Sequence, residues 1–231
     1  MVDSRGNNFV IYSYDGKFMR KIPIHNAYTY QVVLRENDII YANNMFYHSS
    51  KNYELLRASR QDGKLIQRVR STVPEDYKIR LLLREPLLYT YQNEVYYKNP
   101  LKNVICVLRD GLKQYRRYEL NIGMVDNENR DDYFNPKKNR NMINIAGVYE
   151  TEDFLLFFYG YKEKAYWMLC SKQDWMCKAH NYEDCFTDDL SPSEEKFVCR
   201  SFTSVTQRHL ISIREDKEGD ANPTLLVAEL K

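Results

Sequence analysis

Three cysteines and a histidine lie close together in the C-terminal half of the chain, at Cys170, Cys177, His180 and Cys185. Thiolate and imidazole groups are the ligands that zinc prefers in tetrahedral sites. The spacing argues against such a site, because metal-binding cysteines usually stand in closely spaced pairs. Cys170 and Cys177 instead fall on opposite arms of a predicted hairpin.

The register of that hairpin decides what the two cysteines can do. If its turn centres on Gln173 and Asp174, Cys170 faces Cys177 directly across two antiparallel strands. This pairing is compatible with a disulfide in an oxidising compartment, with two buried free thiols, or, least of all, with metal ligation. The chain has five cysteines, so at least one stays unpaired within the chain.

Acidic and aromatic side chains form a second group of candidates. The adjacent carboxylates Asp188 and Asp189 could bind a hard cation or simply form a solvated turn. Tyrosines at alternating strand positions could stack on sugar rings, although core packing explains the same alternation. The candidate ligand-binding residues are Tyr28, Tyr30, Asp188 and Asp189, and the same aromatic pattern recurs at Tyr89, Tyr91, Tyr96 and Tyr97.

Catalytic and cofactor motifs are missing from the sequence. None of the four histidines stands in a metal-binding or catalytic spacing, and there is no phosphate-binding loop, dinucleotide fingerprint or nucleophile elbow. We therefore expect no metal and no cofactor. A hydrolase or lyase remains the alternative, with a site assembled from distant residues such as His48 and Asp188.

Charge and hydropathy restrict the possible partners. The chain of 231 residues has 34 Lys and Arg against 32 Asp and Glu, a net charge of +2, which does not favour nucleic acid. Its longest apolar run, residues 154–159, is too short to cross a membrane. The first residues show no apolar stretch after a basic one, so no secretory signal is expected in this chain.

The elements that would position these residues are β-strands. Tyrosine is frequent (20 residues), glycine is scarce (8), and Tyr, Val, Ile and Phe occur in short runs, which indicates an all-β fold. Asp15-Gly16, Asp62-Gly63 and Asp110-Gly111 each separate two such runs, at intervals of 47 and 48 residues. Because Asp and Gly tolerate the positive φ of tight turns, each pair predicts a β-hairpin.

The repeat predicts the architecture. A fourth hairpin, residues 165–181, follows after an insertion at residues 122–141 that is predicted to be an exposed loop. Two further strand candidates lie between successive hairpins, as at residues 28–34 and 38–42. Four strands in about 47 residues is the size of a β-propeller blade, so we expect residues 1–231 to form a single β-propeller domain of four-stranded antiparallel blades. A little over four blades are present, which predicts an open arc with exposed apolar surface at residues 8–24 and in the final unit.

Several segments resemble a known family. Residues 99–123, the closing residues 219–231 and the hairpin residues 14–18 are similar to those of bacterial six-bladed β-propeller proteins distantly related to NHL-repeat propellers. The resemblance implies an incomplete six-bladed ring, corresponding to the C-terminal two-thirds of such proteins. It also implies a place in the cell envelope, either periplasmic or lipid-anchored, and a binding role without established catalysis.

Together these expectations favour a non-catalytic binding or scaffold protein of the bacterial cell envelope. The ligand would be a glycan, a peptide or another protein, and it would meet the loops or the aromatic side chains of the blades.

Overall fold

The computed structural model of the chain is built from β-strands joined by tight turns. It describes residues 2–3, 8–24, 29–43, 53–71, 86–100, 102–121, 143–184, 186–187, 196–197, 204–205, 209–214 and 224–229. The strands are β1 (Val2–Asp3), β2 (Asn8–Tyr12), β3 (Phe18–Pro23), β4 (Thr29–Leu34), β5 (Asp38–Asn43), β6 (Tyr53–Ser59), β7 (Leu65–Arg70), β8 (Leu87–Tyr91), β9 (Glu94–Lys98), β10 (Val104–Arg109), β11 (Lys113–Glu119), β12 (Asn144–Glu150), β13 (Phe154–Tyr161), β14 (Lys164–Ser171), β15 (Cys177–Asn181), β16 (Phe186–Thr187), β17 (Lys196–Phe197), β18 (Ser204–Val205), β19 (His209–Arg214) and β20 (Thr224–Glu229). A short 3-10 helix, η1 (Tyr182–Asp184), follows β15.

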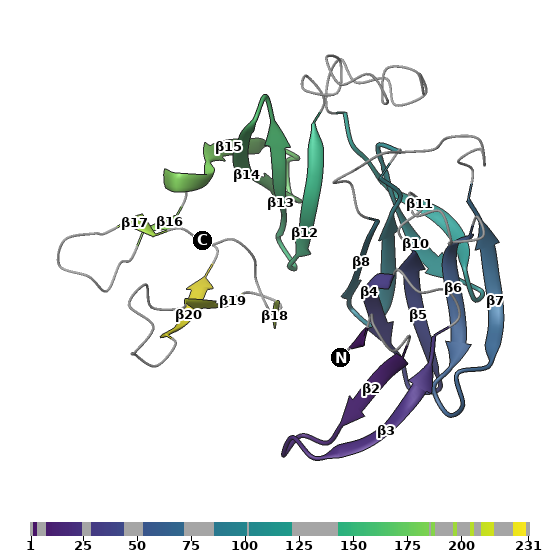
Figure 1. The fold of residues 1–231 in the computed structure, drawn as a ribbon. Helices are drawn as coiled ribbons and strands as arrows, with labels where there is room; N and C mark the ends of the chain where they lie inside the picture. Colours follow the sequence, from purple (N-terminus) through teal and green to yellow (C-terminus); the bar gives the residue numbers. More distant parts are fainter. Residues whose placement is uncertain are drawn as a thin grey trace. The chain divides into compact units, whose positions relative to one another are not determined.

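The strands form six antiparallel sheets in chain order (Figure 1). We name them sheet A (β1–β3), sheet B (β4–β7), sheet C (β8–β11), sheet D (β12–β15), sheet E (β16–β17) and sheet F (β18–β20). Sheets B, C and D each have four strands, and neighbours in sequence are neighbours in the sheet. The chain divides into two compact units, Met1–Glu128 with sheets A to C and Asn129–Lys231 with sheets D to F.

The predicted hairpins and their turn residues are confirmed. Gly16, Gly63 and Gly111 have φ values of 80°, 76° and 88°, a conformation that glycine adopts without steric cost. The turn at Gln92 and Asn93 also has positive φ at both central residues (47° and 63°), which matches the right-handed twist of the strands it joins.

Apolar side chains hold successive sheets together. Alternate residues of sheet B point to opposite faces: Ile39, Tyr41 and Leu56 pack against Phe9 and Ile22 of sheet A. Their neighbours Ile40, Ala42 and Leu55 pack instead against sheet C, where they meet Leu88, Val95, Tyr97, Leu108 and Leu112. Sheet B is thus buried on both faces. In the second unit, Leu156 and Trp167 of sheet D pack with Leu210 of sheet F.

Polar side chains fasten sheet B to sheet C around this apolar contact. Gln31 of β4 accepts a hydrogen bond from the Leu88 backbone. The Glu54 carboxyl of β6 accepts hydrogen bonds from Asn99 Nδ2 (2.9 Å) and Gln114 Nε2 (2.8 Å). Burial raises the pKa of Glu54 above its ordinary value, because desolvation disfavours the charged form.

The architecture agrees with the sequence-based expectation in its main features. The all-β class and the four-stranded antiparallel sheets are confirmed. The described residues form separate sheets and do not include a closed ring or barrel. Residues 122–141 lie outside the described residues. Within the described ranges, no helix has the length and hydrophobicity needed to cross a bilayer.

Candidate functional site

Sheets B, C and D each carry an ion pair where the first strand turns into the second. A carboxylate beside this turn pairs with a cation from the third strand, or from the residue just after it. The pairs are Asp38–Arg57 (2.5 Å), Glu94–Arg109 (2.7 Å) and Glu150–Lys172 (2.8 Å). Because the pair recurs, its ordinary role is to tie strands together at this end of each sheet.

Exposure separates the sheet C pair from the other two. The side chains of Asp38 and Glu150 are 4% and 0% exposed, so both carboxylates are sealed inside the protein. Glu94 is 35% exposed and Arg109 57%. A surface ion pair contributes little to stability. The sheet C pair is therefore the most exposed of the three and contributes the least to holding its sheet together.

Two rows of side chains surround this open pair. Cross-strand pairing aligns Tyr89, Tyr96, Val107 and Tyr115 in one row. In the next row Tyr91 pairs with Glu94 and Arg109 with Lys113, and the Glu94–Arg109 ion pair joins the two. Since directly paired residues share a face, both rows lie on the face of sheet C opposite its contact with sheet B. We call this set the sheet C face: Tyr89, Tyr91, Glu94, Tyr96, Arg109 and Tyr115.

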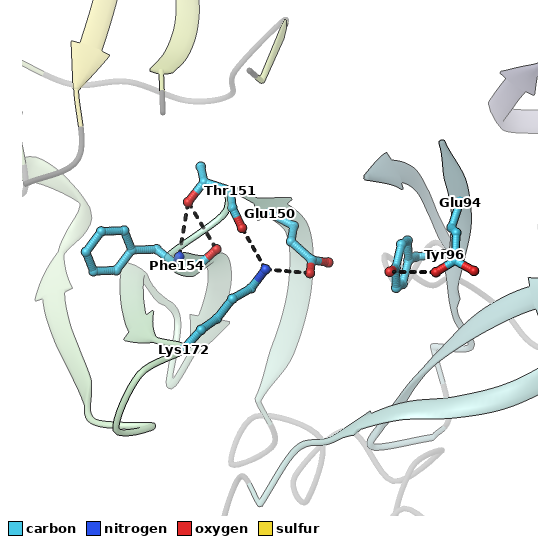
Figure 2. A network of polar contacts seen from close by, with 6 residues as sticks. All are labelled: Glu94, Tyr96, Glu150, Thr151, Phe154 and Lys172. Carbon is cyan, nitrogen blue, oxygen red and sulfur yellow. Dashed lines mark hydrogen bonds and ion pairs between the residues drawn. The ribbon is translucent and has the colours of Figure 1, made fainter. Parts of the chain in front are cut away.

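The aromatic rings of the sheet C face are fixed by one another and by Glu94. Tyr89 and Tyr96 stack with ring centroids 5.0 Å apart and an interplanar angle of 11°, and Tyr91 lies 6.4 Å from Tyr96. The Tyr96 hydroxyl donates to Glu94 Oε2 at 3.4 Å (Figure 2). Arg109 Nε donates to the other carboxylate oxygen at 2.7 Å. Both oxygens of Glu94 are thus oriented before any ligand arrives.

The outer strands of sheets A and B make a recurring contact with the sheet that follows. In those sheets the residue four places after the turn glycine holds the turn of the next sheet. Arg20 donates to the Arg60 and Gln61 carbonyl oxygens, each at 3.0 Å. Gln67 Oε1 accepts from the Leu112 N–H at 3.1 Å.

The corresponding residue of sheet C turns back on its own hairpin. The Tyr115 hydroxyl donates to Asp110 Oδ2 at 2.9 Å, and its side chain stays 42% exposed. This hydrogen bond to a carboxylate raises the pKa of Tyr115.

The side chains of the sheet C face carry chemical groups that are used in recognition, and Tyr96 is buried among them (2% exposed). Tyrosine rings offer apolar surfaces with hydroxyl tips, the guanidinium donates in a planar fork, and the carboxylate accepts. Such a surface suits a polar ligand with stackable faces. In the described part of the chain, no three His, Cys, Asp or Glu side chains lie together as a metal site would require.

The cysteine hairpin has the predicted register. Cys170 of β14 pairs directly with Cys177 of β15, with Cα atoms 4.1 Å apart, and the two sulfurs are bonded. His180 lies further along β15, and Cys185 falls outside the described residues. In the adjacent loop, Lys172 Nζ reaches Glu150 and the Thr151 carbonyl oxygen (Figure 2).

The other residues proposed from the sequence are only partly placed. Tyr28, Asp188 and Asp189 lie outside the described residues, as does His48, and the Tyr30 side chain is also undescribed. Of the second tyrosine group, Tyr89, Tyr91 and Tyr96 come together on the sheet C face. Tyr97 points to the other face and is buried against sheet B.

Sequence reasoning missed Glu94, Arg109 and Tyr115. The turn at Gln92 and Asn93 was the available signal, because a two-residue hairpin loop fixes the pairing of Tyr91 with Glu94. The pairing of Glu94 with Arg109 then depends on the next turn. The openness of this pair depends on which faces are covered, and the sequence pattern does not reveal that.

Comparison with known proteins places the chain in a family. The family described as "Domain of unknown function (DUF4934)" matches residues 1–224. The chain is similar in fold to the crystal structure of a Bacteroides fragilis protein described as a "putative exported protein", with a TM-score of 0.50, 12% identity, and coverage of 100% of this chain and 87% of that one. No curated protein matches the chain.

The resemblance to NHL-like six-bladed propeller proteins is therefore wrong as a family assignment. The match is to a different family, and the structure has separate four-stranded sheets and not NHL repeats. The physical reason is that Asp-Gly turns about 47 residues apart follow from the size of any four-stranded antiparallel sheet. The spacing of these turns indicates the size of the sheets and does not identify a family.

Proposed function

This chain belongs to the DUF4934 family, and we propose that it is a non-catalytic binding protein of the bacterial cell envelope that engages its ligand through the sheet C face. The observation that carries the proposal is the exposure of the Glu94–Arg109 pair, because the corresponding carboxylates in sheets B and D are buried. The stacked Tyr89 and Tyr96 rings, of which Tyr96 is buried, hold the neighbouring side chains in place, and such preorganisation lowers the entropic cost of binding.

Two observations support the cell envelope. The Cys170–Cys177 disulfide suits an oxidising compartment, because cytosolic thiols are normally kept reduced. The structural neighbour from Bacteroides fragilis carries the description of an exported protein. Export of this chain is part of the proposal.

The stacking of the sheets supports a blade-like arrangement. Sheet A packs on sheet B and sheet B on sheet C through apolar faces, in chain order. We include in the proposal that these sheets are successive blades of a propeller-like array. This part of the proposal assigns neither a number of blades nor kinship with NHL proteins.

The test is a binding screen of the whole chain on glycan and peptide arrays. Arg109→Ala and Tyr91→Ala should each reduce the signal about tenfold, because both remove contact groups from the sheet C face. Arg68→Ala is the matched control: Arg68 is also exposed and lies 4.6 Å from the Tyr53 ring, but on β7. Binding that Arg68→Ala and Arg109→Ala reduce equally, or no binding at all, would count against the proposal.

A further inference from the structure

Three carboxyl side chains are buried in the described part of the chain, and Glu54 alone among them forms no ion pair with a cation. The other two, Asp38 and Glu150, are each paired. Glu54 is 2% exposed, and its oxygens accept hydrogen bonds from the neutral side-chain amides of Asn99 and Gln114. A buried charge that is not paired with a cation is costly. The surroundings of Glu54 therefore favour a carboxyl group that has bound a proton.

A β-bulge directs the Glu54 side chain toward sheet C. Tyr53 of β6 pairs with Arg70 of β7 and Leu55 pairs with Val69, so Glu54 is an extra residue between two paired positions. Such a bulge bends the strand locally and changes the direction of a side chain. The Glu54 carboxyl consequently lies at the contact between sheets B and C, where it meets amides from the end of β9 and from β11.

The Tyr97 hydroxyl is a second buried polar group at this contact. Tyr97 is 0% exposed and packs among the apolar side chains between sheets B and C. No described residue forms a hydrogen bond with its hydroxyl. Its polar neighbours are Glu54, Asn99 and Cys106, and the Asn99 amide nitrogen already donates to Glu54. A buried hydroxyl without a partner is costly. A carboxylic acid, unlike a carboxylate, has an O–H that it can donate to the hydroxyl oxygen.

Other ionisable groups surround this contact. They are Lys98 of β9, Lys102 in the loop between β9 and β10, Cys106 of β10, Arg116 of β11, and Arg68 and Arg70 of β7. The two β7 arginines lie on the far face of sheet B, because their paired residues pack against sheet A. Lys98 lies on the far face of sheet C from Tyr97.

The remaining cations favour the charged form of Glu54 only weakly. Lys102 and Arg116 are exposed, so solvent screens their charges. Burial raises the pKa of Glu54 and also that of the Cys106 thiol. Desolvation thus outweighs the attraction of the nearby cations, and both groups are held toward their neutral forms.

We infer that the contact between sheets B and C is proton-linked: Glu54 binds a proton, shares it with the Tyr97 hydroxyl, and thereby tightens the contact. The carboxyl O–H is the donor and the Tyr97 oxygen the acceptor, so one proton removes a buried charge and satisfies a buried hydroxyl. The folded protein holds this proton more strongly than the unfolded chain does. The stabilisation is therefore complete below the unfolded pKa of about 4.3 and is lost as the pH rises through the folded pKa. The inference goes beyond the proposed function, since the sheet C face lies on the other side of that sheet.

The half-buried thiol of Cys106 can report on the contact, because Cys106 pairs directly with Tyr97. With Cys185→Ser and Cys199→Ser, it is the one thiol of the chain outside the disulfide. Its rate of reaction with dithiodipyridine, divided by the rate in urea-unfolded protein at the same pH, gives its protection. From about pH 4 to 7.5, the range above the ordinary glutamate pKa, protection should fall severalfold as the contact loosens. Glu54→Gln should abolish this fall, and Glu119→Gln, at an exposed carboxyl of β11, should preserve it.

Carbon-13 NMR of labelled glutamate side chains follows the proton itself. The carboxyl resonance that disappears in Glu54→Gln should titrate above the ordinary glutamate value of about 4.3 in the wild type. Tyr97→Phe keeps the ring and removes the acceptor of the carboxyl proton, so it should move this titration to lower pH.

Three results would overturn the inference. The first is a wild-type Glu54 that titrates at its ordinary value. The second is Cys106 protection that stays constant or rises with pH in the wild type. The third is a Tyr97→Phe titration that is unchanged or moves to higher pH, because the hydroxyl would then be either uninvolved or a donor to the carboxylate. The first two are measured without altering either group, so they decide the matter even if a variant fails to fold.

Discussion

The β6–β7 and β14–β15 hairpins share nearly the same turn and differ at one residue. Ser59 and Ser171 open them, and each is followed by a basic residue, glutamine and aspartate. The serine hydroxyl accepts from the backbone N–H two residues on, at 3.2 Å in both turns. The next residue is Gly63 in one turn and Trp175 in the other, with φ values of 76° and 59°.

The difference shows that the turn's hydrogen bonds set the backbone shape and that the residue at its tip decides what the turn can touch. Gly63 is buried against β3, where a side chain would not fit. Trp175 is 56% exposed and keeps the same left-handed conformation at a steric cost. The Cys170–Cys177 disulfide closes the strands next to it. One hairpin is held by packing and the other by a covalent bond.

The largest expected effect is at the packed turn. Gly63→Ala should lower the free energy of unfolding by about 3 kcal/mol, because left-handed backbone strain adds to a clash with backbone and side-chain atoms of β3. Gly16→Ala is the control, with the same φ and open space around it, and should lose only about 1 kcal/mol. Urea denaturation followed by circular dichroism measures both. Equal losses would show that packing does not distinguish the two turns.

Opening the disulfide should have the next largest effect. Cys170→Ser with Cys177→Ser should lower the free energy of unfolding of the second unit by about 2 kcal/mol, since a short closed loop restricts the unfolded chain. Reduced wild-type protein should match the double variant. If thermal scans with and without reductant coincide, the covalent bond does not support this hairpin.

Restoring glycine at the exposed turn should give a smaller effect of the opposite sign. Trp175→Gly relieves the left-handed strain and should raise the free energy of unfolding by about 1 kcal/mol or less, because the added freedom of the unfolded chain offsets part of the gain. Met176→Gly, one residue on, relieves no such strain and should be destabilising. A loss of stability in Trp175→Gly would mean that the indole makes contacts that outweigh the strain.

The smallest expected effect is a dependence on acid pH that both hairpins share. The pKa of Asp62 is lowered by its hydrogen bond with Ser59, and that of Asp174 by the backbone N–H two residues on. The pKa of Asp15 is lowered in the same way by its hydrogen bond with Ser13. Each aspartate has a lower pKa in the folded protein than in the unfolded chain. Its contribution to folding stability is therefore present above about pH 3.9 and is lost as the pH falls through the folded pKa.

Asp174→Asn should therefore flatten the acid limb of the stability profile and leave neutral stability nearly unchanged. The effect should be slight, because the group is fully exposed. Denaturation midpoints measured between about pH 2 and 5, the range in which aspartate titrates, test it. Glu152→Gln, at another exposed carboxyl, is the control. Parallel profiles for Asp174→Asn and the wild type would contradict the assignment.

Residues close together in the sequence were sufficient to predict the hairpins. The candidate site depends instead on contacts between residues far apart in the chain. Asp-Gly pairs demand positive φ, so the turns at Gly16, Gly63 and Gly111 followed from the sequence, as did the pairing of Cys170 with Cys177. The open Glu94–Arg109 pair was not predictable, because Asp38–Arg57 has the same local pattern and is buried. Coverage of a face by another sheet depends on contacts far apart in the chain.

The burial of Trp167 and the exposure of Trp175 have an optical consequence. These are the only two tryptophans of the chain; Trp167 lies on β14, and Trp175 lies in the turn between β14 and β15. Intrinsic indole fluorescence therefore reports on the second unit alone, whereas tyrosine emission comes from both units. Trp167, 2% exposed, should emit at shorter wavelength than Trp175. Replacing Trp175 with phenylalanine would leave a single buried indole, so that selective excitation of tryptophan would follow the melting of the second unit.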